Sequence, residues 1–149
     1  VHTNDAAGAI TRLLDMGVEN YLISSALLGV LAQRLVRVIC KTCVEPTKVS
    51  PALMVEMGSH DQGDIKTFHG KGCKECSHTG FRGRTGIYEL LVVDDAIRQL
   101  ILTKSTAQII RETARKKGMT TLREDGWKKV AEGITTVEEV LRVTLNEQT

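Results

Sequence analysis

The chain has 149 residues, of which 42% are hydrophobic and 26% are charged, so it can bury one core with a small satellite unit attached. Its 20 basic and 18 acidic side chains are well mixed and leave a net charge of +2, which argues against a strong polyanion-binding or membrane-surface field. The longest apolar run, residues 21–32, has about 12 residues, whereas a bilayer span needs about 18 to 20, so no transmembrane segment is expected. The N-terminus lacks an initiating methionine and the features of a signal peptide, which favours a fragment of a longer protein.

The first forty residues predict two helices and a strand. Apolar residues recur at helical spacing between Thr3 and Gly17, with Thr3 or Asn4 as the N-cap and Gly17 just after the last turn. Residues 20–32 are apolar on nearly all sides and predict a second helix that is covered by other elements. Residues 34–40 are rich in branched side chains and predict a short strand. We expect these three elements to close a larger α/β core.

A polar insert follows residue 40 and holds both prolines of the chain. Ser50 as an N-cap and Pro51 as the first helical residue predict one short helix that ends before Gly58. Residues 64–69 predict a strand. An insert this small and polar cannot be stabilised by apolar burial alone, so it is expected to need a covalent or metal cross-link.

The rest of the chain predicts a strand, residues 84–93, followed by helices, the first at residues 94–102. Three capping-box patterns then each open a helix: Ser105 with Gln108, Thr121 with Glu124, and Thr136 with Glu139. We expect the first two of these helices to stop at Gly118 and Gly133, and Trp127 to be a core residue. The last helix is expected to bury one stripe: Val137, Val140, Leu141, Thr144 and Leu145. The expected fold class is therefore α/β, mainly α.

All four cysteines occur in C-x-x-C pairs, Cys40 with Cys43 and Cys73 with Cys76. Both thiolates of such a turn can point into one site, and two turns supply the four soft ligands that tetrahedral zinc prefers. A redox motif would need a single reactive pair that opens a helix, and disulfides would need an oxidising compartment. The spacing therefore predicts a structural zinc site, which with four protein ligands has no open position for a catalytic water.

Other polar residues near the cysteines are expected to have supporting roles. His69 and His78 flank the second pair and are expected to be exposed loop residues and not ligands. Three basic side chains would offset the negative charge of a four-thiolate site: Lys41, Lys74 and Arg82. Four arginines are expected on a solvated strand face: Arg34, Arg37, Arg82 and Arg84. The glycine series at positions 80, 83 and 86 lacks the lysine of a phosphate loop and predicts a turn that leads into a strand.

Four stretches, in this order, together resemble the C-terminal part of the secretion and pilus-assembly traffic ATPases: VHTNDAAGAITRLLDMGVE, LLGVLAQRLVRVIC, GFRGRTGIYELL and GMTTLREDGWKKVAEGITTVEEVLRVT. The resemblance covers essentially the whole chain and is nearest to the type II secretion ATPase (GspE-like) branch. It implies three parts: the C-terminal portion of a RecA-like ATPase core (residues 1–39), an inserted tetracysteine zinc-binding subdomain (40–80), and a C-terminal strand and helical bundle (81–149).

The same resemblance implies a function for the parent protein. It would be a cytoplasmic homo-hexamer, held at the bacterial inner membrane through partner proteins of the secretion assembly, whose ATP turnover drives pseudopilus assembly. His2 matches the family's histidine box, which lies near the γ-phosphate of the nucleotide, and the cysteines Cys40, Cys43, Cys73 and Cys76 match its zinc-binding subdomain. The chain has no G-x-x-x-x-G-K-[ST] loop and no acidic metal-binding box. ATP and Mg²⁺ are therefore expected to bind the full-length parent only, and the fragment alone is expected to be inactive.

Two other classes of protein stay open. A zinc ribbon with nearby basic residues could bind nucleic acid, although the aromatic content of 3% and the absence of a concentrated basic face argue against it. A stand-alone zinc interaction domain could dock on neighbouring subunits or on inner-membrane components. We expect no nucleic-acid binding and no direct membrane insertion.

Overall fold

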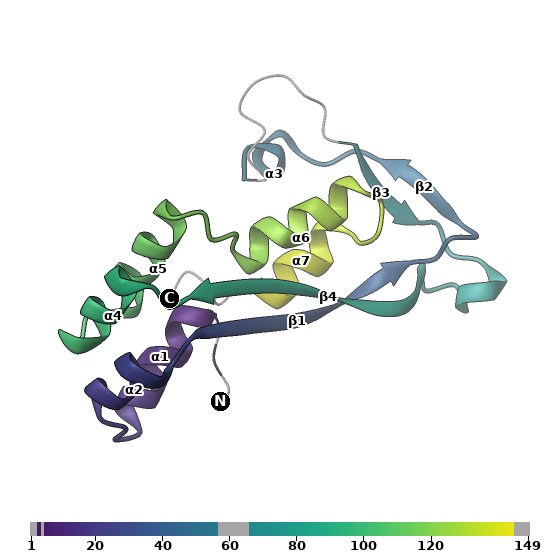
Figure 1. The fold of residues 1–149 in the computed structure, drawn as a ribbon. Coiled ribbons are helices and arrows are strands. Elements are labelled where there is room, and N and C mark those ends of the chain that lie inside the picture. Colours follow the sequence, from purple (N-terminus) through teal and green to yellow (C-terminus); the bar gives the residue numbers. More distant parts are fainter. Residues whose placement is uncertain (1–2, 4, 57–65, 145–149) are drawn as a thin grey trace. The chain divides into compact units, whose positions relative to one another are not determined.

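The computed structural model describes residues 3, 5–56 and 66–144. The described part is mixed α/β and mostly helical (Figure 1). Its helices are α1 (Ala6–Asp15), α2 (Asn20–Ala26), α3 (Pro51–Glu56), α4 (Asp95–Leu102), α5 (Ala107–Lys116), α6 (Leu122–Ala131) and α7 (Val137–Thr144). Its strands are β1 (Gly29–Ile39), β2 (Val44–Thr47), β3 (Thr67–Gly70) and β4 (Phe81–Val92), and one 3-10 turn, η1, spans Lys74–Cys76. Within the described ranges, none of the helices has the length and apolarity that a membrane crossing requires.

The strands form two small sheets, and the chain forms two compact units. β1 pairs with β4, and β2 pairs with β3. Among the described residues, the first unit is built from segments 5–33 and 88–122, and the second from segments 34–56, 66–87 and 123–144. β1 and β4 contribute residues to both units.

The core of the first unit lies between the helices and one face of the strands. Its buried members come from α1, α2, α4, α5 and the end of β4: Ala6, Ala7, Ile10, Ile23, Leu91, Val93, Ile97, Ile101, Ile110 and Ala114. Glu89, also buried, accepts the N–H of Ala6 at 2.8 Å and that of Leu122 at 3.1 Å, the first residues of α1 and α6. Burial raises the pKa of this carboxyl group. Glu89 thus ties the starts of two helices to β4.

The core of the second unit lies between α6 and α7. Trp127, Val130, Val137 and Val140 form the buried cluster, as the sequence predicted for Trp127. The two helices approach closely at Gly126, where a Cβ atom would lie 2.6 Å from Cγ1 of Val140.

Two expectations for the first unit are wrong. Asp5 and not Thr3 or Asn4 caps α1, because its Oδ1 accepts the N–H of Gly8 at 2.9 Å; Asn4 itself lies outside the described residues. Residues 20–32 do not form one helix: α2 stops at Ala26, and residues 29–32 belong to β1. A short apolar run fits a buried helix or a buried strand equally well, and pairing of β1 with β4 decides for the strand.

The expectations for the C-terminal helices are partly right. Thr106 and not Ser105 caps α5 with its side chain. Thr136 caps α7 by accepting the N–H of Glu139 at 3.2 Å, as predicted. The reciprocal half of that capping box is replaced, however, because the Glu139 carboxylate accepts the backbone N–H of Arg37 instead. The strands predicted at residues 34–40 and 84–93 are confirmed as parts of longer strands: each ends one residue before the predicted end, and β1 and β4 begin five and three residues before the predicted starts.

Candidate metal centre

The four cysteine sulfurs meet at one point of the second unit. All four Sγ atoms lie within 4.8 Å of one another. Sγ of Cys40 is 3.8 Å from Sγ of Cys73, Sγ of Cys43 is 3.8 Å from Sγ of Cys76, and Cys73 and Cys76 are 3.7 Å apart. Zinc with bonds of about 2.3 Å to four sulfurs at tetrahedral angles has edges of about 3.8 Å. The sulfur cluster therefore fits a tetrahedral ion, and the cysteines are free thiols.

The secondary structure explains how residues far apart in sequence reach this site. The first pair lies between β1 and β2, and the second pair begins and ends η1. β2 and β3 pair antiparallel, with Val44 opposite Gly70, and so return the chain to the first pair. The N–H of Cys40 then donates to the carbonyl of Gly80 at 2.9 Å, which joins the first turn to the end of the second.

Backbone N–H groups point at sulfurs of both cysteine turns. Cys43 Sγ accepts the N–H of Gly72 at 3.3 Å. Cys76 Sγ accepts two, from Cys73 at 3.3 Å and from Gly80 at 3.2 Å. Hydrogen bonds to a sulfur stabilise its ionised form, so the backbone is arranged for thiolates, the form that binds metal.

The acidity of the thiols follows from these contacts. Burial raises the pKa of Cys76, but the N–H groups of Cys73 and Gly80 outweigh it and leave a pKa of about 6. The N–H of Thr42 is the main cause that lowers the pKa of Cys40. Burial raises the pKa of Cys43 to about 12. A bound divalent cation would ionise this last thiol as well, because a coordinating thiol loses its proton.

The neighbouring histidines are not part of the sulfur cluster. Within the described residues, the group that could hold a metal contains the four cysteines and neither ring. His69 lies in β3, within the range where a strand was predicted and not in a loop as expected for a histidine beside the cysteines, and its Nε2 is 2.8 Å from Oε1 of Glu45. His78 is exposed and follows η1 with a φ of 62°.

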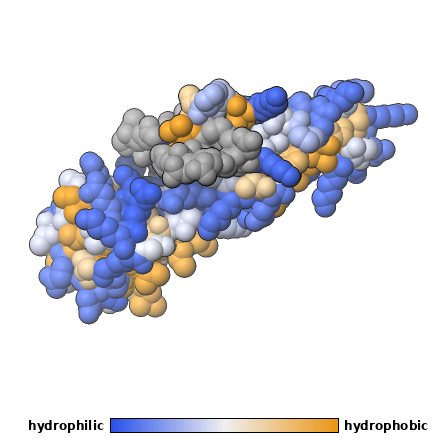
Figure 2. Space-filling model, turned by 90° about the horizontal axis from the view of Figure 1, so that it is seen from above, coloured by the Kyte–Doolittle hydropathy of each residue, from blue (hydrophilic) through white to orange (hydrophobic). Residues whose placement is uncertain are grey.

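The surface around the cysteine turns is hydrophilic (Figure 2). Lys41, Lys74 and Arg82, which were expected to offset the thiolate charge, are exposed. Arg82 also faces Glu75 at 3.5 Å, and both side chains are more than half exposed. This ion pair adds little stability, and it removes part of the positive charge that was expected to offset the thiolates.

Arg37 lies in β1 with a half-exposed side chain, as predicted, but it also forms interactions that the sequence did not predict. Its guanidinium lies 4.1 Å from the ring centroid of Phe81 and 2.8 Å from Oε1 of Glu139. Arg142 binds the same carboxylate at 2.9 Å. Although burial alone would raise the pKa of Glu139, Arg142 and Arg37 lower it to about 2. Local patterns predicted no ion-pair cluster here beyond the capping pattern, because Arg37 lies 102 positions before Glu139, whose carboxylate it shares with Arg142.

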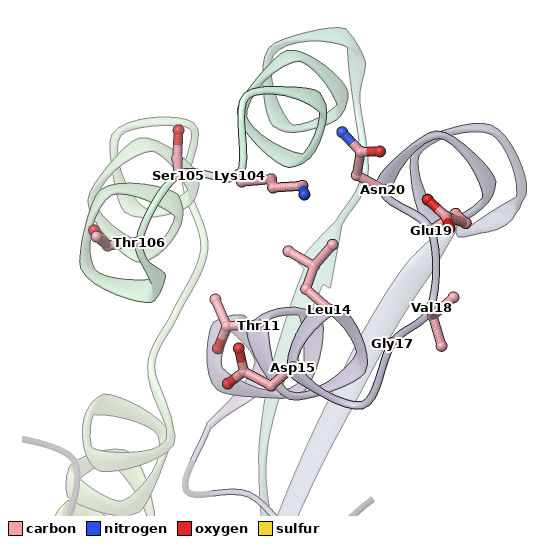
Figure 3. A pocket seen from close by; sticks show the side chains of 10 residues that line it. All are labelled: Thr11, Leu14, Asp15, Gly17, Val18, Glu19, Asn20, Lys104, Ser105 and Thr106. Atoms are coloured by element: carbon pink, nitrogen blue, oxygen red, sulfur yellow. The ribbon is translucent and has the colours of Figure 1, made fainter.

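A separate pocket of about 520 Å³ lies in the first unit. Its lining comes from α1, the α1–α2 loop and the α4–α5 connection, and includes Leu14 and Lys104, which point into the space between the helices (Figure 3). The pocket holds no cysteine or histidine, so it lacks the ligands that mark the sulfur cluster.

His2, the other residue singled out by the sequence, lies outside the described residues. Nearby, Asp5 forms an ion pair with Arg111 of α5. The start of α1 is thus held by two contacts, the ion pair of Asp5 with Arg111 and the hydrogen bond from Ala6 to Glu89.

Comparisons with known proteins show which family the chain belongs to. A family model described as "Type II/IV secretion system protein" matches residues 1–142. The chain is 52% identical over 147 residues to the type II secretion system protein E of Pseudomonas aeruginosa, which covers 99% of the chain and 29% of that relative. It is 52% identical over 148 residues to the type IV pilus assembly ATPase PilB of Thermus thermophilus, and this match covers 97% of the chain and 16% of PilB. It is 48% identical over 144 residues to the type II secretion system ATPase E of Vibrio cholerae (97% and 28%). The chain thus spans less than a third of the length of these relatives, and it belongs to the type II/IV secretion system protein family.

Proposed function

We propose that the chain is the C-terminal, zinc-containing portion of an ATPase that powers type II protein secretion. The observation that carries the proposal is the four-sulfur cluster, with three sulfur–sulfur distances of 3.7 to 3.8 Å and all four sulfurs within 4.8 Å of one another, in a chain whose relatives include a protein named as a type II secretion ATPase. The parent protein is a cytoplasmic hexamer that binds ATP and Mg²⁺ and works at the inner membrane through partners of the secretion assembly. This portion has a structural and contact role and does not hydrolyse ATP by itself, since it lacks the phosphate loop.

In this proposal, Cys40, Cys43, Cys73 and Cys76 hold a structural zinc ion. Zinc, when bound, supplies a cross-link between two chain segments and no reactive water, because four protein ligands fill its coordination. The small two-stranded sheet of β2 and β3 has four residues in each strand, too few to be stable on its own. The cross-link would therefore hold this sheet beside the start of β4.

The proposed organisation of the parent follows the resemblance in the sequence. Residues 1–39 would close a RecA-like ATPase core, residues 40–80 would be the zinc-binding subdomain, and residues 81–149 the C-terminal strand and helical part. His2 would lie near the γ-phosphate of ATP bound elsewhere in the parent.

An exposed apolar strand face in the first unit supports the contact role. Leu31 of β1 and Leu90 and Val92 of β4 are 61%, 56% and 62% exposed, whereas Leu91 on the opposite face is fully buried. Apolar side chains gathered on one face of a two-stranded sheet are typical of a surface that another part of the protein or a partner covers. This observation also favours the second candidate, a zinc-stabilised interaction domain.

Two measurements test the proposal. Native mass spectrometry of the purified chain should show one retained zinc ion, which a strong chelator removes together with the folded charge states. A fully folded chain without metal would refute the zinc assignment. Magnesium-dependent ATP hydrolysis should be absent from the purified chain, and any measurable turnover that co-purifies with it would contradict the proposed division of roles.

A pull-down separates the contact role from the nucleic-acid alternative. Membrane components of the secretion assembly should be retained by the wild-type chain and lost with Cys73→Ser, which removes one of the four sulfurs. Glu75→Gln, a change at an exposed residue of the same turn, is the matched control. A salt-dependent mobility shift of DNA or RNA by the wild-type chain, with no retention of membrane components, would favour the nucleic-acid alternative instead.

A further inference from the structure

Two glycines cross each other beside the sulfur cluster. Gly70 ends β3, and Gly80 comes directly before β4. A Cβ atom on Gly70 would lie 2.1 Å from the carbonyl oxygen and 2.6 Å from the Cα atom of Gly80. A Cβ atom on Gly80 would lie 2.6 Å from the carbonyl oxygen of Gly70. Because these are backbone atoms, no side chain can rotate away, and only glycine at both positions permits the crossing.

The crossing connects both cysteine turns. Gly80 donates its N–H to Cys76 Sγ at 3.2 Å and accepts the N–H of Cys40 on its carbonyl at 2.9 Å. Gly70 lies opposite Val44, the residue that follows Cys43. Gly80 is thus hydrogen-bonded to one cysteine of each pair, Cys76 and Cys40. Gly70 is paired with the residue next to a third cysteine, Cys43.

We propose that Gly70 and Gly80 form a backbone lock that sets the distance between the two cysteine turns, and so are positioning residues for metal affinity and geometry. The proposal rests on the zinc site proposed above. Since Cβ atoms do not approach other heavy atoms within 3.0 Å, a methyl group on Gly70 would push the two backbones apart by about 1 Å. Three sulfur–sulfur distances of 3.7 to 3.8 Å already match a tetrahedral ion with bonds of about 2.3 Å, so a shift of this size would disturb the fit.

The chain offers three glycine variants that separate a steric clash from backbone strain. Gly70→Ala adds the clash alone, because Gly70 is not among the residues with positive φ. Gly83→Ala adds strain alone: its φ is 82°, equal to that of Gly80, and nothing lies within 4 Å of the added atom. Gly80→Ala adds both. The ratio of the metal affinities of Gly80→Ala and Gly83→Ala therefore isolates the effect of the clash at a matched φ.

The experiment uses Co²⁺ as the probe in the full 149-residue chain. The visible d–d bands of Co²⁺ report tetrahedral thiolate coordination, and competition with Zn²⁺ gives the metal affinity. Fluorescence of Trp127, the single tryptophan, reports whether the helical core of the second unit is folded. Loss of groups that support metal ligands typically weakens affinity 10- to 100-fold. We expect a loss of that order for Gly70→Ala relative to wild type, and for Gly80→Ala relative to Gly83→Ala, each with altered Co²⁺ bands.

Gly83→Ala should retain the wild-type Co²⁺ bands, because its strain lies away from the sulfurs. Wild-type affinity and bands in Gly70→Ala would overturn the lock, as would equal losses in Gly80→Ala and Gly83→Ala. If Gly70→Ala does not fold by Trp127 fluorescence, the comparison of Gly80→Ala with Gly83→Ala still decides. Failure of the wild-type chain to give tetrahedral Co²⁺ bands would overturn the zinc site itself, whereas normal wild-type binding with no effect of the variants overturns the lock alone.

Discussion

Glu139→Gln tests the ion-pair cluster that joins α7 to β1 within the second unit. The side chain of Glu139 is 3% exposed, and its carboxylate accepts from the backbone and guanidinium of Arg37 and from the guanidinium of Arg142. Glutamine preserves the shape, removes the charge and places an NH₂ group where only acceptors fit. The variant therefore leaves two guanidinium groups without their shared anion.

The expected magnitude comes from the pKa of Glu139, which is lowered from 4.5 to about 2. At 1.36 kcal/mol per pKa unit this difference corresponds to about 3 kcal/mol. Because the arginine side chains are 49% and 57% exposed, solvent screens part of the interaction, and a loss of about 2 to 3 kcal/mol is expected near neutral pH.

The loss should depend on pH with a definite sign. A carboxyl group whose pKa is lower in the folded state stabilises the folded chain fully above its unfolded value. For Glu139 that stabilisation is present above pH 4.5 and disappears as the pH falls toward about 2. The stability difference between wild type and Glu139→Gln should therefore shrink across this window.

The assay is urea unfolding followed by Trp127 fluorescence, at saturating zinc near neutral pH. At decreasing pH only the difference between wild type and Glu139→Gln is read, because acid release of zinc lowers the stability of both chains. Glu138→Gln is the matched control, because Glu138 is the exposed neighbour in the same helical turn. The reasoning is refuted if Glu139→Gln costs less than about 1 kcal/mol near neutral pH, the range of surface pairs, or if its effect is equal to that of Glu138→Gln.

Three further outcomes are expected. Zinc removal should unfold the cysteine-containing part of the chain, since binding at such sites supplies folding free energy on the order of 10 kcal/mol. Acid should release the zinc, because the thiols regain their protons. A chromogenic zinc indicator read against pH checks the acid release, and release that does not respond to pH would contradict it. Asp94→Ala should lower the free energy of unfolding by about 1 kcal/mol, because Asp94 caps α4 by accepting the N–H of Ile97. Asp95→Ala, at the exposed neighbouring residue, should lower it less. Equal shifts of the thermal unfolding midpoint in the two variants would exclude the cap. Gly126→Ala should destabilise by about 1 to 3 kcal/mol although alanine favours helices, because its methyl group would meet Val140; a stabilised variant in urea unfolding would show that the two helices can separate without cost.

Much of the local structure was predictable, because it depends on patterns within a few residues. The spacing in α1, α4 and α7 and the branched residues of β1 and β4 predicted elements that the structure contains. The two C-x-x-C turns predicted that four cysteines would come together, and their sulfurs do lie within 4.8 Å of one another. The zinc ion itself stays a prediction.

The errors arose where a distant partner decided between local options. Residues 27–32 could continue a helix, but pairing with β4 draws residues 29–32 into a strand. Glu139 had the position of a capping-box residue, but Arg37, 102 positions earlier, binds its carboxylate. A strand was predicted up to His69, but the strand that pairs with it was not, and β2 pairing places His69 beside Glu45.

The sequence by itself determined the ligand type, the family and most of the elements in their order, because these depend on residue identity and short-range spacing; β2 was not predicted. Only the tertiary structure decided which backbone atoms close the sulfur cluster and which charges are buried. The crossing of Gly70 and Gly80 is the clearest case, since glycine is compatible with many conformations and its spacing carries no sign of a contact. That contact exists only because pairing of β3 with β2 places the end of β3 against the residue before β4.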